Sequence, residues 1–135
     1  MATAPALHCS VITPETQIFD GPAEFVVIPA HDGEIGILHD RAPLLAKLGA
    51  GRMRVRAVGG GEESWFVDGG FAQVLDNRVV VLTQKAVRPD QIDPAKAAAQ
   101  LAAARAMPTG DEVAFKRKAV AEASARAQLR VAGGG

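Results

Sequence analysis

Residues 52–58 read Arg-Met-Arg-Val-Arg-Ala-Val, in which basic and apolar side chains alternate. Successive side chains of a β-strand point to opposite faces, so one face would bury Met53, Val55 and Ala57 while the other exposes the three guanidinium groups. An α-helix would instead spread both sets around its circumference. The stretch therefore predicts a strand with one buried face.

The sequence on both sides continues in short β-rich runs separated by turn residues. Residues 24–28 (EFVVI) and 79–82 (VVVL) are rich in β-branched side chains and predict buried strands. Gly59-Gly60-Gly61 lacks the Lys-Ser/Thr of a phosphate-binding loop and predicts a flexible hairpin turn. Asp76-Asn77 predicts a tight hairpin, because asparagine tolerates positive φ. We therefore expect residues 1–88 to form a β-sandwich domain.

The pattern becomes helical after residue 89. Asp93 followed by Pro94 is typical of a helix start, because the carboxylate caps free amides and proline fits the first helical position. Alanine, the residue with the highest helix propensity, fills eight of the twelve positions 95–106. This segment predicts a first helix.

A second helix is expected after the break at residues 107–110. Thr109 and Glu112 fit a capping box, and the helix would run to about Val131. Two helices with a short connection form an antiparallel hairpin, so residues 89–135 predict a small all-α domain. Faces made of alanine bury little apolar area. The hairpin should therefore be marginally stable by itself and able to detach from the surface on which it packs.

Composition narrows the class of protein. The chain has 135 residues and no formal net charge, which argues against general nucleic-acid binding. Its single cysteine, Cys9, excludes an intrachain disulfide, fits a reducing compartment and is interpreted as a small buried hydrophobe. No apolar run approaches the roughly 18 residues of a spanning helix, and residues 1–10 carry no secretory or organellar targeting pattern. We expect a protein of the cytoplasm or an equivalent compartment.

Residues with catalytic or metal-binding potential do not form a recognised pattern. His8, His31 and His39 lack metal-ligand spacing with one another and with Cys9. His31 and His39 each precede an aspartate, which favours polar pairs in loops. The sequence has no G-x-S-x-G elbow, Walker loop or G-x-G-x-x-G fingerprint. The chain is therefore predicted not to be an enzyme by itself and to hold no metal.

Charge is uneven along the second predicted helix. Between residues 116 and 130, five basic residues face only Glu122, and they are Lys116, Arg117, Lys118, Arg126 and Arg130. Two interpretations stay open, a solvated basic face and a surface that binds an acidic protein.

Four segments of the chain resemble the epsilon subunit family of F-type ATP synthases. In order, they are residues 8–21 (HCSVITPETQIFDG), 33–38 (GEIGIL) with 42–45 (APLL), 65–71 (WFVDGGF) and 127–131 (AQLRV). Each segment is weak alone, but all four occur in the family's order, and the resemblance as a whole runs from about residue 6 to 131. The second segment is the most specific.

The resemblance implies a non-catalytic subunit of the central rotor stalk. Its sandwich would dock on the gamma subunit and, through a loop with Gly33, Glu34, Arg41 and Pro43, on the ring of c subunits. Gly33 and Gly36 would permit a tight loop tip that exposes Glu34. In a bacterium the protein would lie on the cytoplasmic face of the inner membrane, held there by the complex.

The resemblance also implies a regulatory hairpin that either folds against the sandwich or extends along gamma. When extended, Lys116, Arg117, Arg126 and Arg130 would meet an acidic loop of the beta subunit and inhibit ATP hydrolysis.

Some members of the family bind ATP through an Ile/Leu-Asp-x-x-Arg-Ala motif in the hairpin. The corresponding residues here are Ile92, Asp93, Lys96 and Ala97, so lysine replaces the arginine. Lysine keeps the charge but lacks the planar fork that binds phosphate at two points. We expect weak or absent ATP binding and no other cofactor.

Two other classes of function compete with the rotor-stalk subunit. One is a free-standing β-sandwich adaptor whose basic helical tail binds an acidic protein. The other is a small ligand-binding or hydrolytic domain with a cryptic site, for which no residues stand out. Co-purification with a multi-subunit ATPase would separate the first two.

Overall fold

The structure is a computed structural model that describes residues 6–133. Residues 1–5 of the predicted sandwich and 134–135 of the predicted hairpin lie outside the described residues. The elements, in order, are β1 (Leu7–Ile12), β2 (Gln17–Ala30), β3 (Gly33–Ile37), β4 (Leu44–Lys47), β5 (Ala50–Ala57), β6 (Glu62–Asp68), β7 (Phe71–Leu75), β8 (Arg78–Leu82), β9 (Ala86–Val87), a 3₁₀ helix η1 (Pro89–Gln91), α1 (Pro94–Arg105) and α2 (Glu112–Ala132).

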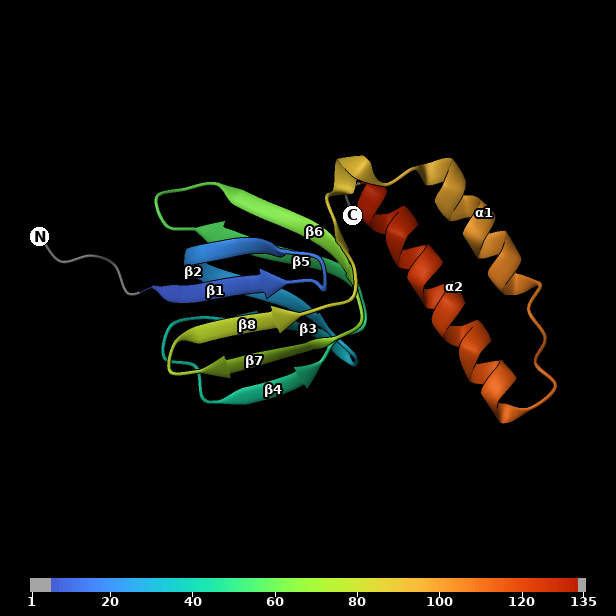
Figure 1. The fold of residues 1–135 in the computed structure, drawn as a ribbon, viewed down its shortest axis with the longest axis horizontal. Coiled ribbons are helices and arrows are strands. Elements are labelled where there is room, and N and C mark those ends of the chain that lie inside the picture. Colours follow the sequence, from blue (N-terminus) through green and yellow to red (C-terminus); the bar gives the residue numbers. More distant parts are fainter. Residues whose placement is uncertain (1–5, 134–135) are drawn as a thin grey trace, which may run out of the picture.

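The strands form one sheet that folds over into two layers, as Figure 1 shows. The strand order is β4-β7-β8-β1-β2-β5-β6-β9, and β3 pairs with β2. Strand β2 belongs to both layers, because residues 17–23 pair with β1 and residues 23–30 pair with β3 and β5. The predicted β-sandwich followed by two helices is confirmed.

Strand β5 shows how the alternating sequence builds the core. Met53 and Val55 are fully buried between the layers, in one apolar cluster with Trp65 of β6. The prediction that every arginine of this strand is exposed is wrong. Arg52 and Arg54 are half-buried, and only Arg56 is exposed. Arg52 is half-buried because α2 lies over this end of β5.

Both predicted hairpin turns are confirmed. Glycines 59–61 connect the antiparallel strands β5 and β6, and all three have positive φ, from 92° to 98°. Asp76 and Asn77 connect β7 and β8 with φ of 50° and 61°. Two central residues with positive φ match the twist of a two-residue hairpin, which explains why a small polar pair stands there.

The predicted capping residue is confirmed for α1, whereas the capping residue of α2 differs from the predicted one. The Asp93 carboxylate accepts hydrogen bonds from the backbone amides of Ala95 and Lys96, at 3.0 and 3.3 Å. At α2 the cap is Asp111, whose carboxylate accepts from the Ala114 amide at 2.8 Å, and not the predicted Thr109. Residues 107–110 are used to reverse the chain, so α2 begins later than a Thr109 cap would require.

The helical hairpin lies at one end of the sandwich, against the outer face of β5 and β6 (Figure 1). A small apolar cluster joins the two parts, and it consists of Phe66, Ala127 and Val131 with Ala50 and Ile92 beside them. The Ser124 hydroxyl also donates to the Asp68 carboxylate at 2.6 Å. Within residues 6–133, neither helix combines the length and the apolar character that crossing a bilayer requires.

Candidate functional site

The four residues predicted to contact a rotor ring do not lie in one loop. Gly33 and Glu34 begin β3, which pairs antiparallel with the end of β2, whereas Arg41 and Pro43 lie in the connection that follows β3. The single-loop expectation is therefore wrong. Residues 33–37 alternate and pair with β2, so the segment becomes a strand and places the two pairs at its opposite ends.

The connection after β3 is fixed by contacts with the turn between β7 and β8. Asp40 has φ of 64°, its backbone amide donates to the Asn77 side-chain oxygen at 2.7 Å, and Asn77 Nδ2 donates to the Asp40 carboxylate at 3.3 Å. His39 Nδ1 lies 3.2 Å from the same carboxylate, which confirms the predicted polar pair. Arg41 is held half-buried beside this network.

The basic residues of α2 occupy different environments in the docked hairpin. Lys116 and Arg126 form ion pairs one turn away, with Glu112 and Glu122, each at 3.2 Å. Arg117 and Arg130 are exposed and have no ion pair within residues 6–133. Ion pairs of this kind stabilise a helix by only about 0.3–0.5 kcal/mol each, so the two paired cations can exchange their partners for other acidic groups.

An apolar groove runs beside these cations. Val113, Phe115 and Val120 of α2 are each at least 60% exposed. Val113 and Val120 line a hollow together with Lys116, Arg117 and Met107. The first half of α2 thus presents apolar and basic side chains side by side.

The residues of the ATP-binding motif surround a second, smaller hollow between the hairpin and the sandwich. Its lining includes Ile92, Asp93 and Lys96, together with Lys85 and Gln128, while Ala97 is buried within the hairpin. The Asp93 carboxylate is engaged in capping α1. Of the residues that the structure describes, two lysines are the only cations that line this hollow, and neither offers a bidentate fork.

An exposed apolar face on the sandwich was missed by the sequence analysis. It is formed by Leu45, Phe71, Leu75 and Leu82, which are between 45% and 72% exposed, and Phe71 pairs with Leu82 across β7 and β8. No helix covers this face in Figure 1. The available signal was that residues 71–75 carry apolar side chains at both alternating positions, which indicates a strand covered on two sides.

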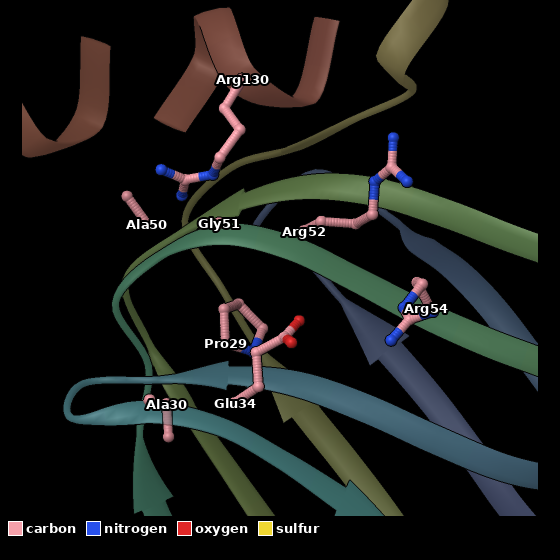
Figure 2. A pocket seen from close by; sticks show the side chains of 9 residues that line it. Pro29, Ala30, Glu34, Ala50, Gly51, Arg52, Arg54 and Arg130 are labelled. Carbon is pink, nitrogen blue, oxygen red and sulfur yellow. The ribbon is translucent and has the colours of Figure 1, made fainter. Parts of the chain in front are cut away.

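A cluster of arginines at the junction of hairpin and sandwich was also missed. Figure 2 shows Arg52 and Arg54 of β5, Arg130 of α2 and Glu34 of β3 around one open cavity of about 540 Å³. Sheet pairing through β2 places Glu34 near the two β5 arginines, and the docking of α2 adds Arg130, which is distant in the sequence.

The remaining polar and thiol groups suit structural roles. Burial, with a smaller effect from the charge of Asp20, raises the pKa of the Cys9 thiol to about 12, so it stays protonated and unreactive. Asp20 accepts from Ser10 and pairs with His8, both at 2.7 Å, and these hydrogen bonds, that from Ser10 above all, lower the Asp20 pKa. In residues 6–133, no three His, Cys, Asp or Glu side chains come together as metal ligands.

Comparison with known sequences identifies the sandwich. Residues 6–89 match the family model described as the ATP synthase delta/epsilon chain, beta-sandwich domain. The ATP synthase epsilon chain of Rhodopirellula baltica is 43% identical over 125 residues, which cover 93% of this chain and 97% of that protein. The epsilon chain of Thermosynechococcus vestitus is 41% identical over 132 residues, covering 92% and 93%.

Comparison with solved structures extends the similarity to the hairpin. A chain in the Euglena gracilis mitochondrial ATP synthase structure of OSCP, F1 and c-ring superimposes with a TM-score of 0.82 at 26% identity, covering 98% of this chain and 84% of that one. A chain in the Tetrahymena thermophila central stalk and c-ring structure has the same fold, with a TM-score of 0.75 at 14% identity, covering 93% and 96%. The family model matches the sandwich, and the two relatives are 43% and 41% identical over more than nine-tenths of the chain. Together with the two-part fold, these matches show that this chain belongs to the ATP synthase delta/epsilon chain family.

Proposed function

We propose that this chain is a non-catalytic subunit of the central rotor stalk of a proton-translocating F-type ATP synthase. The observation that carries the proposal is family membership over more than nine-tenths of the chain, including both the sandwich and the hairpin. In a bacterial cell the complex would hold it at the cytoplasmic face of the inner membrane.

The apolar face of the sandwich is the proposed docking surface for the gamma subunit. Phe71 and Leu82 form its centre, and the hollow beside them is lined by Ile12 and Pro14. Exposed apolar patches of this kind are typical of interfaces between proteins. An aspartate in place of Leu82 would put a charge in the interface without disturbing the core, because Leu82 is about half exposed.

Assembly with the complex tests this docking surface. Leu82→Asp should reduce the amount of this subunit that co-purifies with gamma from native membranes by about tenfold, since a buried unpaired charge costs more than 1.4 kcal/mol. Val58→Asp, an exposed apolar position in the β5–β6 turn, is the matched control and should assemble normally. Normal assembly of the Leu82 variant would exclude this face.

The proposed contact with the ring of c subunits runs along the edge strand β3. Strand β3 has five residues and is roughly 17 Å long, with Glu34 near its start and Arg41 beyond its end, so a surface that uses both runs along most of the strand. Among residues 6–133, strand β3 pairs with β2 alone, which leaves its other edge available. Cysteines placed at Glu34 and at Pro43 should both crosslink to the ring, and crosslinking of only one would shorten the proposed contact to one end.

Regulation by the hairpin is the proposed role of the α2 cations. The docking cluster is small and rests on Ala127, Val131 and Phe66, so α2 can leave the sandwich at modest cost. Released, it would present Lys116, Arg117 and the exposed apolar side chains to an acidic surface on the beta subunit.

ATP hydrolysis by the reconstituted complex tests the regulatory role. Truncation after Arg88 should raise hydrolysis while leaving assembly intact. Replacing Lys116, Arg117, Arg126 and Arg130 together with alanine should reproduce most of the increase, because no single exposed ion pair is worth more than about 1 kcal/mol. Unchanged hydrolysis in both variants at equal occupancy would leave the hairpin without a braking role.

A further inference from the structure

The cavity at the hairpin–sandwich junction, the arginine cavity, has a charged wall and a floor of small residues. Arg52, Arg54 and Arg130 supply three guanidinium groups, and Glu34 supplies the one carboxylate that residues 6–133 place in the lining (Figure 2). The rest of the lining is Pro29, Ala30, Gly33, Ala50 and Gly51. Small floor residues leave room for a ligand to reach the guanidinium groups.

Two of the three positive charges in the arginine cavity have no ion-pair partner among residues 6–133, and the third has only a distant one. Within residues 6–133, Arg52 and Arg130 form no ion pair, and the nearest carboxylate to Arg54 is that of Glu62, at 4.0 Å. Arg52 donates from Nη2 to the Val131 carbonyl over a long 3.5 Å, and its buried Nε has no hydrogen-bond partner in the described part of the chain. A buried donor without a partner is costly, and a bound acceptor would remove that cost.

The three cations come from two parts of the chain, the sandwich and the hairpin. Arg52 and Arg54 are on β5 and Arg130 is on α2, so their mutual repulsion acts across the docking surface. An anion between them would convert this repulsion into attraction. Guanidinium groups match phosphate oxygens with two parallel hydrogen bonds, which favours phosphate as the ligand chemistry.

We propose that the arginine cavity binds a phosphate-bearing anion and that the bound anion holds α2 against the sandwich. The minimal ligands are inorganic phosphate and pyrophosphate, and the phosphates of a nucleotide offer the same chemistry. The cavity shares no lining residue with the hollow of the ATP-binding motif around Ile92 and Lys96. The proposal does not depend on the rotor assignment, because it concerns the isolated chain.

Calorimetric titration of the full chain with phosphate, pyrophosphate and ADP, at constant ionic strength, tests the binding. Saturable one-to-one binding of pyrophosphate is expected. Arg130→Gln and Arg54→Gln should each weaken it about tenfold, since each removes charge-assisted hydrogen bonds. Glu34→Gln should tighten it about threefold, because it removes the one repulsive charge. Arg105→Gln, an equal loss of charge at the end of α1 and away from the cavity, is the matched control and should change nothing.

Comparing the affinities for phosphate, pyrophosphate and ADP distinguishes a site for free phosphate from a site for a nucleotide. Tighter binding of ADP through the same arginines would assign the cavity to a nucleotide, and tighter binding of pyrophosphate would assign it to free phosphate. Binding that is lost in Lys96→Ala but kept in Arg130→Gln would place the anion at the ATP-binding motif and overturn the proposal. The proposal would also be overturned if Arg105→Gln weakened pyrophosphate binding as much as Arg130→Gln does, or if pyrophosphate binding did not saturate at tens of millimolar.

Hydrogen exchange tests the holding of α2. Pyrophosphate should slow the exchange of amides between Ser124 and Val131 in the natural chain and leave it unchanged in Arg130→Gln. Binding without slower exchange would overturn the holding role while keeping the site.

Discussion

The sandwich and the hairpin differ in the size of the side chains that they bury. The sandwich encloses Trp65, Met53 and many branched aliphatic residues, each of which stabilises by about 1.5–3 kcal/mol when fully buried. The buried residues of α1 are Ala97 and Ala104, and those of α2 are two alanines, one glutamine and one valine. The sandwich therefore buries most of the apolar surface that stabilises the chain, and the hairpin contributes much less.

Removing the largest core side chain should give the largest effect. Trp65→Ala should lower the free energy of unfolding of the sandwich by about 3–5 kcal/mol, as large aromatic truncations do. Urea unfolding followed by far-UV circular dichroism measures the loss, and labelling of the buried Cys9 thiol reports exposure of the core. A loss below about 1 kcal/mol would remove the contrast with the hairpin.

The turn between β6 and β7 gives a second test of how tightly the sandwich is specified. A Cβ at Gly70 would lie 2.0 Å from the Leu82 carbonyl oxygen, and Gly70 has φ of 107°. Gly70→Ala should therefore destabilise the sandwich by about 3 kcal/mol, from strain and the backbone clash. Gly69→Ala, with φ of 76° and open space around its Cβ, should cost only about 1–2 kcal/mol. Thermal unfolding compares the pair, and equal melting temperatures would contradict the clash.

Removal of the hairpin should cost less than either substitution. A chain that ends at Arg88 should still unfold cooperatively, because the main apolar cluster lies between the two layers and contains no helix residue. The loss is limited to the cluster around Phe66 and should stay near 2 kcal/mol. A dispersed amide spectrum would support two independent domains. A collapsed spectrum would mean that the sandwich needs the hairpin to fold.

The smallest effect concerns one exposed carboxylate of the sandwich. Hydrogen bonds from Ser10 and His8 lower the pKa of Asp20 below its ordinary value of 3.8. Since the folded pKa is the lower one, this contribution is present above pH 3.8 and is lost as the pH falls through the folded pKa. Ser10→Ala should move the Asp20 titration midpoint upward in a carboxyl NMR titration. The α2 amide shifts should not follow it, because Asp20 lies on β2 opposite β1 and away from the hairpin. An unchanged midpoint would show that the Ser10 hydroxyl does not stabilise the carboxylate.

Local sequence determined the strand at residues 52–58, the turns at 59–61 and 76–77, and the start of α1 at Asp93. Each depends on neighbouring residues, through side-chain alternation, positive φ or capping, and the structure confirms each. Tertiary structure alone decided that Glu34 and Arg41 lie at opposite ends of β3, because the pairing of β3 with β2 sets their separation. Tertiary structure also brought Arg52 and Arg54 close to Arg130, because Val131 of α2 packs against Phe66 of β6. Contacts between residues so distant in the sequence leave no periodic pattern from which they could be predicted.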